Sequence, residues 1–139
     1  MAKGYLEKRL KELGRNDIEV SSTGLIPLVG MEATEEAKQV AKEDGIDLSS
    51  HRTRTLTEAE IQKQDLIFVM ERQHKEYIIS KYPEVRSKLY LLKDFKKIGN
   101  FDTSENPDIE DPIAKDVDFY KKTFAVIKES IERILKEIN

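Results

Sequence analysis

The chain has 139 residues, of which 38% are hydrophobic and 37% are charged, and its formal net charge is −3. This length supports one domain with a single hydrophobic core, and the composition excludes a disordered chain. No apolar run is long enough to span a membrane, and no basic excess favours nucleic acid. The sequence contains no cysteine, which excludes disulfides, thiolate metal sites and cysteine nucleophiles among these residues.

The first half of the chain predicts three helices and one strand. Apolar residues at helical spacing predict a helix over residues 2–13 that ends at Gly14, and a second helix over residues 34–44 that ends at Gly45. A short strand is predicted between them at residues 18–20. Thr57 and Glu60 have the spacing of a capping box, which predicts the start of a short third helix.

The second half alternates strands and helices. The near-continuous apolar run at residues 65–70 is typical of a strand covered on both faces. Residues 71–82 predict a helix that ends before Pro83, and residues 89–92 predict another strand. After a loop over residues 93–112, an amphipathic helix begins near Val117 behind an Asp116 cap. Strands alternating with helices predict one α/β domain over residues 1–139, with a parallel sheet.

Three short motifs lie at the ends of these elements. Ser-Ser-Thr-Gly follows the first predicted strand at residues 21–24, His-Arg-Thr-Arg occupies residues 51–54, and Glu-Asp-Pro occupies residues 110–112. In order and spacing along the whole chain, they resemble the low-molecular-weight protein-tyrosine-phosphatase family and its protein-arginine-phosphatase relatives. The resemblance implies a three-layer α/β/α sandwich with parallel strands in the order 2-1-3-4, in which the three predicted strands are strands two, three and four.

The first strand of that family and its catalytic C-x5-R loop have no counterpart in these residues. In the family the loop leads into a helix, and the corresponding helix here begins at Ala2. The resemblance therefore implies that a strand and a loop are missing before Met1. We expect the 139 residues alone to be inactive, and we expect upstream residues or a strand from a partner chain to take the place of the first strand.

The resemblance assigns acid–base chemistry to Asp111. In the family, a cysteine thiolate attacks phosphorus, an aspartic acid protonates the leaving group, and its carboxylate then activates water. Asp111 matches this general acid and base, and Pro112 restricts the backbone directly after it. Outside the family context, an Asp-Pro pair is most often a plain turn.

Four further positions match structural or substrate-contacting residues of the family. Ser22 and His51 match residues that hydrogen-bond the phosphate loop, and Arg54 matches the position of a structural ion pair. Ile113 replaces the usual aromatic wall of the substrate slot, which leaves open the choice between phosphotyrosine and phosphoarginine. Without the resemblance, Ser22 is interpreted as a turn cap and His51 as a helix cap or surface histidine.

The expected function is that of a cytoplasmic phosphomonoesterase, which uses a cysteinyl-phosphate intermediate in the intact family. Its expected substrates are phosphorylated protein side chains or small phosphomonoesters. No cofactor motif and no metal-ligand spacing occurs in the sequence, and neither nucleic acid nor a membrane is expected as a partner. The alternative is a non-catalytic pseudo-phosphatase that binds or regulates a partner. Arsenate reductases of the same fold are disfavoured, because they need downstream cysteines.

Overall fold

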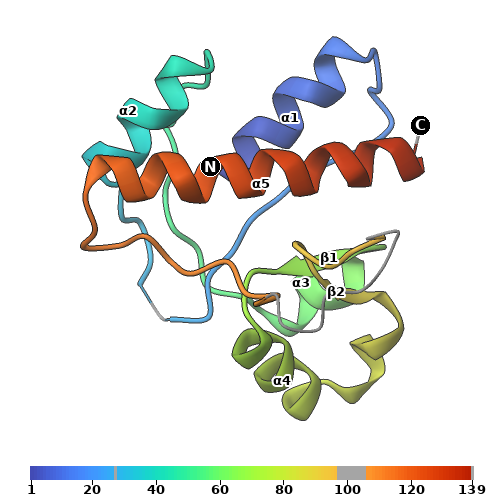
Figure 1. The fold of residues 1–139 in the computed structure, drawn as a ribbon. Coiled ribbons are helices and arrows are strands. Elements are labelled where there is room, and N and C mark those ends of the chain that lie inside the picture. Colours follow the sequence, from blue (N-terminus) through green and yellow to red (C-terminus); the bar gives the residue numbers. More distant parts are fainter. Residues whose placement is uncertain (27, 97–105, 139) are drawn as a thin grey trace. The chain divides into compact units, whose positions relative to one another are not determined.

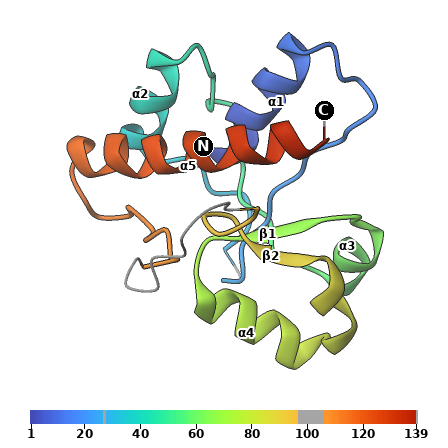
Figure 2. The same ribbon diagram turned by 45° about the vertical axis from the view of Figure 1, so that its right-hand side comes forward.

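The computed structural model describes residues 1–26, 28–96 and 106–138, and the chain divides into two compact units. The first unit comprises Met1–Leu56 and Pro112–Lys128, and the second comprises Thr57–Asp111 and Glu129–Asn139. Their α-helices and strands are labelled in Figure 1 and shown from a second side in Figure 2. Within the described ranges, no helix is both long enough and apolar enough to cross a membrane.

The helices of the first unit begin and end where local sequence signals predict. They are α1 (Ala2–Glu12), α2 (Glu35–Glu43) and the first half of α5 (Val117–Ile138). Thr34 starts α2, because its Oγ1 atom accepts a hydrogen bond from the Ala37 amide at 3.2 Å. A glycine with positive φ follows each of the first two helices, Gly14 at 71° and Gly45 at 73°.

Side-chain contacts join these helices into the core of the first unit. Thr34 Oγ1 donates a hydrogen bond to the Tyr120 hydroxyl at 3.0 Å, which links the start of α2 to α5. The Tyr5 ring of α1 meets the Phe124 ring of α5 edge to face, with 6.0 Å between centroids. The apolar residues buried in this unit are Leu10, Ala37, Val40, Ala41, Ile46, Leu48, Tyr120, Phe124 and Ile127.

The second unit contains a parallel pair of strands, as predicted. Its elements are α3 (Glu58–Lys63), β1 (Ile67–Val69), α4 (Arg72–Lys81), the 3-10 helix η1 (Pro83–Lys88), β2 (Leu89–Leu91) and the second half of α5. β1 and β2 pair in parallel, with Phe68 opposite Tyr90, and Phe95 packs edge-on against both rings. Both views show α4 beside these strands, as part of the connection between them. The predicted α/β class is therefore confirmed.

The predicted strand at residues 18–20 is wrong. These residues are irregular, and they belong to no ladder in the part of the chain that the structure describes. A strand needs a neighbour that pairs with its backbone groups, and apolar sequence alone does not supply one. In the first unit, parallel pairing occurs further along instead, as an isolated bridge between Gly24 and Thr55.

Two details of the second unit also differ from the prediction. Pro83 follows α4 as expected, but residues 83–88 continue as η1, because Pro at the first position suits a helical turn. The apolar run at residues 65–70 forms a strand only at its centre. Leu66 lies outside β1 and is 41% exposed, so the expected cover on both faces does not extend to this end of the run.

Lys88 secures the end of α3, and its replacement should destabilise the fold. Its Nζ atom donates hydrogen bonds to the carbonyl oxygens of Ile61 and Gln64, both at 2.8 Å. Lys88→Met keeps the apolar stem but removes the donor from these acceptors, so we expect the free energy of unfolding to fall by about 1–3 kcal/mol. Urea denaturation measures this change. The matched control is Lys63→Met on the exposed surface of α3, which should change stability by less than about 0.5 kcal/mol. Equal losses in the two variants would contradict the capping role.

Candidate functional site

The predicted site residues are divided between the two units. The first unit contains five of them: Ser22, His51, Arg54, Pro112 and Ile113. Asp111 is the last residue of the second unit before the chain passes into the first. The predicted loop supports and the predicted general acid therefore belong to different units.

Ser22, a predicted loop support, and Arg54, a predicted structural residue, are brought together in the first unit. The Gly24 amide donates to the Arg54 carbonyl at 2.8 Å, and the Leu56 amide donates to the Gly24 carbonyl at 2.9 Å. Arg54 Nη2 then donates to the Ser22 carbonyl at 3.4 Å. The segment after Ser22 is thus fixed beside the segment after His51. The structural ion pair predicted for Arg54, and the contacts of Ser22 with a phosphate loop, stay predictions.

His51 is half-buried near several positive charges of the first unit. Its pKa is lowered from the ordinary value of 6.5, first because burial disfavours the imidazolium and then because the Met1 ammonium, Lys3 and Arg52 repel it. The imidazole is therefore neutral near neutral pH, and a neutral imidazole offers one donor and one acceptor. Both groups suit the predicted support of a backbone loop.

The lowered pKa of His51 predicts a stability change with pH. Because the folded chain binds the His51 proton less tightly than the unfolded chain, acidification favours unfolding. This contribution to stability is present above the unfolded pKa of about 6.5 and is lost as the pH falls through the lowered pKa of folded His51. His51→Gln should reduce the change in urea midpoint over this pH range. His74→Gln is the control and should leave it in place. If the urea midpoint of His51→Gln changed with pH as much as that of the unsubstituted chain, His51 would not be the origin of the change.

In the second unit, the loop before Asp111 is fixed to the end of β1 and the start of α4. The Ile109 amide donates to the Met70 carbonyl at 2.8 Å, and the Ile109 side chain is 5% exposed. Asp108 accepts a hydrogen bond from the Arg72 amide at 2.8 Å. Burial raises the pKa of Asp108, but hydrogen bonds from the amide and guanidinium of Arg72 outweigh it, so this pKa is lowered overall. Asp111, two residues after Ile109, is exposed.

Sequence reasoning missed the contact between Asp108 and Arg72. The two residues lie 36 positions apart, and neither belongs to a motif that the sequence singled out. Helical and strand periodicities connect only near neighbours. The one available signal was that an acidic residue, Asp108, lies three positions before Asp111. By itself, such a residue cannot be distinguished from any other carboxylate in a loop.

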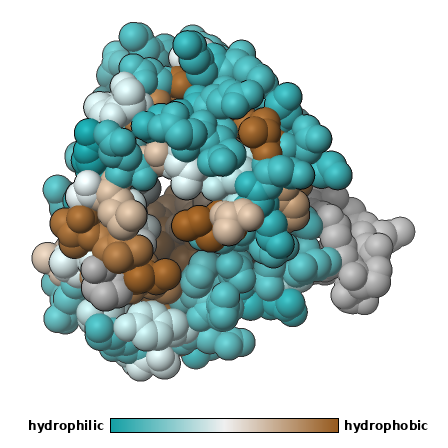
Figure 3. All heavy atoms as spheres, turned by 90° about the vertical axis from the view of Figure 1, so that its left-hand side faces the viewer, coloured by the Kyte–Doolittle hydropathy of each residue, from teal (hydrophilic) through white to brown (hydrophobic). Residues whose placement is uncertain are grey.

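Apolar side chains are exposed in the first unit. Ile113, predicted as a substrate wall, is 63% exposed. Residues 26–31 contribute four more large apolar side chains that are at least half exposed, namely Ile26, Leu28, Val29 and Met31. Two backbone hydrogen bonds join this segment to Thr53. The Gly30 amide donates to the Thr53 carbonyl at 2.8 Å, and the Thr53 amide donates to the Met31 carbonyl at 2.9 Å. On the face drawn in Figure 3, several apolar side chains gather among mostly hydrophilic ones.

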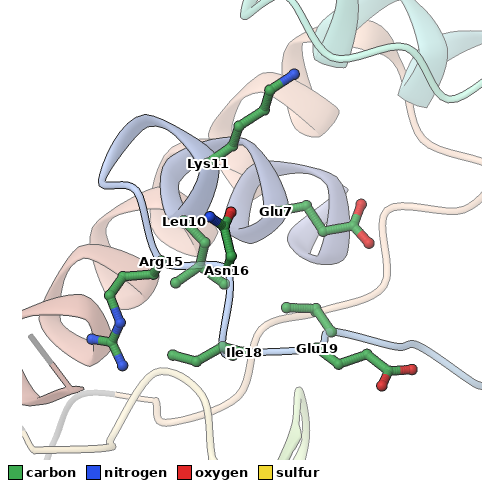
Figure 4. Close-up of a pocket in the computed structure, with 8 residues that line it drawn as sticks. Glu7, Leu10, Lys11, Arg15, Asn16, Ile18 and Glu19 are labelled. Atoms are coloured by element: carbon green, nitrogen blue, oxygen red, sulfur yellow. The ribbon is translucent and has the colours of Figure 1, made fainter.

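The first unit also has a pocket of about 350 Å³ beside α1. Leu10 and Ile18 turn toward the space between α1 and the segment that follows it, while Lys11 points away (Figure 4). The other lining residues are Glu7, Arg15, Asn16, Glu19 and Val20. None of the predicted site residues lines this pocket, so it is not assigned to the candidate site.

Known proteins resemble this chain along most of its length. A family model for low molecular weight phosphotyrosine protein phosphatase matches residues 1–139. The protein-arginine-phosphatase of Bacillus subtilis strain 168 is 29% identical over 133 residues, covering 96% of this chain and 84% of that protein. The low molecular weight protein-tyrosine-phosphatase Wzb of Escherichia coli K12 is 31% identical over 130 residues, covering 94% and 80%. The solved low molecular weight protein tyrosine phosphatase of T. tengcongensis superposes with a TM-score of 0.87 at 33% identity, covering 98% of this chain and 88% of that one.

Proposed function

Because this chain belongs to the low molecular weight phosphotyrosine protein phosphatase family, we propose that it supplies the general acid and base of a cytoplasmic phosphomonoesterase. The proposed substrates are phosphorylated side chains of proteins. The observation that carries the proposal is the match of the family model to all 139 residues, with Asp111 and Pro112 in the loop before α5.

The proposed reaction has two steps, and Asp111 acts in both. A cysteine thiolate attacks phosphorus, the phosphorus–oxygen ester bond breaks, and Asp111 gives its proton to the leaving oxygen. Water then attacks the cysteinyl phosphate, its proton passes to the Asp111 carboxylate, and the phosphorus–sulfur bond breaks to return the thiolate. The sequence contains no cysteine, so these residues by themselves lack the nucleophile.

The remaining predicted site residues have supporting roles in this proposal. A neutral His51 and the Ser22 hydroxyl suit a phosphate loop, because each satisfies backbone groups that such a loop turns inward. Ile113 offers an aliphatic rather than an aromatic wall to the phosphorylated side chain. An aliphatic wall lacks the stacking that favours a phenyl ring, so phosphotyrosine and phosphoarginine are both proposed as substrates.

The test compares two polypeptides. One is the 139-residue chain, and the other, here called the extended chain, carries a strand of about five or six residues and a C-x5-R-S-P loop before Met1. We expect no hydrolysis of an aryl phosphate by the 139-residue chain. The extended chain should release a burst of product followed by slower turnover. Peptides with phosphotyrosine and phosphoarginine then identify the preferred side chain.

Controls separate the possible outcomes. An extended chain with serine at the cysteine position should fold but not turn over. Hydrolysis by the 139-residue chain, traceable to that chain, would contradict the need for a thiolate. A folded but inactive extended chain, together with binding of phosphopeptides by the 139 residues, would instead establish the non-catalytic binding module.

A further inference from the structure

One carboxylate ties the loop before Asp111 to the first turn of α4. Asp108 Oδ1 accepts hydrogen bonds from the Arg72 amide at 2.8 Å and from Arg72 Nε at 3.2 Å. Asp108 Oδ2 accepts a third from Arg72 Nη2 at 3.3 Å. Asp108 therefore binds both the backbone and the side chain of a residue 36 positions away in the sequence.

The same carboxylate caps α4. The N-cap residue, Glu71, makes no side-chain capping hydrogen bond, and the first amides of a helix have no partner within the helix. A capping carboxylate usually comes from the N-cap residue itself, but here Asp108 supplies it from the loop. The positive end of the helix dipole also favours a carboxylate at this place. The Asp108 carboxylate therefore both caps α4 and fixes the loop to it.

Neighbouring contacts restrict the loop on both sides of Asp108. Its amide donates to Asn106 Oδ1 at 3.0 Å, and Lys93 Nζ donates to the Asn106 carbonyl at 2.7 Å. On the other side, the amide of the buried Ile109 donates a hydrogen bond to the carbonyl of Met70, the residue directly after β1. Asp111 follows two residues after Ile109, so its backbone extends from a fixed point of the second unit.

The geometry points to Asp108 and Arg72 as positioning residues that hold Asp111 for proton transfer, an inference that rests on the proposed function. The side chains of Arg72 and Asp108 are 59% and 21% exposed. Because their contact joins the loop to the first turn of α4, it restricts the location of the loop. Location matters for a general acid, because a displacement of about 1 Å lowers a rate by up to about 10²-fold.

The first test uses the 139-residue chain and needs no activity. Asp108→Ala is expected to lower the NMR backbone order parameter of Asp111 from about 0.85, a rigid value, toward about 0.6, a flexible one. Asp17→Ala is the matched control, because Asp17 accepts a similar fork from Arg15 Nε and Nη2, each at 2.8 Å. It should leave Asp111 unchanged. An unchanged order parameter in Asp108→Ala overturns the inference, whether or not the proposed function holds.

The second test uses the extended chain. Asp108→Ala should lower kcat/KM about 10-fold to 100-fold for an alkyl phosphate, and much less for an aryl phosphate with a good leaving group. Asp108→Asn keeps an acceptor for the Arg72 amide and should lose less. Equal losses with both substrates indicate a merely structural role and overturn the inference. If the unsubstituted extended chain is inactive, the proposed function fails, and the order parameter of Asp111 decides the positioning role alone.

Discussion

Replacing Asp111 with alanine in the extended chain is expected to slow hydrolysis of an alkyl phosphate by about 10²–10⁴-fold. An alkoxide is a poor leaving group, so the transition state depends on a proton delivered to the oxygen. An aryl phosphate with an electron-withdrawing ring needs that proton much less, so its hydrolysis should slow less. The ratio of the two rates is therefore a more specific readout of the general acid than either rate alone.

Two further variants control for this result. Asp111→Asn keeps the shape of the side chain but carries no acidic proton, so it should reproduce the loss. Glu110→Ala removes the neighbouring exposed carboxylate and should leave the ratio unchanged. If Asp111→Ala left the rate with alkyl phosphates unchanged, the general-acid role would be wrong. Stopped-flow measurement of the first turnover separates this step from the hydrolysis of the phosphoenzyme.

Helix boundaries were predictable because the groups that set them are local. Thr34 and Thr57 accept hydrogen bonds from amides three residues later, and so does Asp116 at the start of α5. Gly14 and Gly45 have the positive φ that a residue after a helix often adopts. The site residues were predicted in another way, from a resemblance to a known family that extends along the whole chain. Their assignment to Ser22, His51, Arg54, Ile113 and Asp111 therefore stays a prediction.

The wrong and missing predictions concern contacts between residues that are distant in the sequence. Residues 18–20 have an apolar pattern suited to a strand, but strand formation depends on a partner that the pattern does not specify. The pairing between Gly24 and Thr55, and the cap that Asp108 provides for α4, join residues that lie 31 and 36 positions apart. No local periodicity encodes such contacts. The candidate site is built largely from them, so its geometry required the structure.

Replacing Phe124 with alanine is expected to lower the free energy of unfolding by about 3–5 kcal/mol. Phe124 is 1% exposed and contacts the Tyr5 ring edge to face. Lys128 Nζ lies 4.8 Å from its centroid, which adds a cation–π interaction. Truncation removes these contacts and leaves a cavity that close-packed neighbours fill only in part. A loss of this size is a large fraction of the whole stability of a domain, which is about 5–15 kcal/mol.

Phe119 in the same helix provides a matched comparison. It also has a lysine near its ring, with Lys115 Nζ 5.7 Å from the centroid, but its side chain is only half-buried. Phe119→Ala should therefore destabilise the chain by about 0.5–2 kcal/mol, while Phe124→Ala lowers the melting temperature by roughly 10–20 °C. Calorimetry and urea denaturation measure both variants. Equal losses would show that the cation–π contact outweighs burial, and a negligible loss for Phe124→Ala would show that the core of the first unit is not packed around this ring.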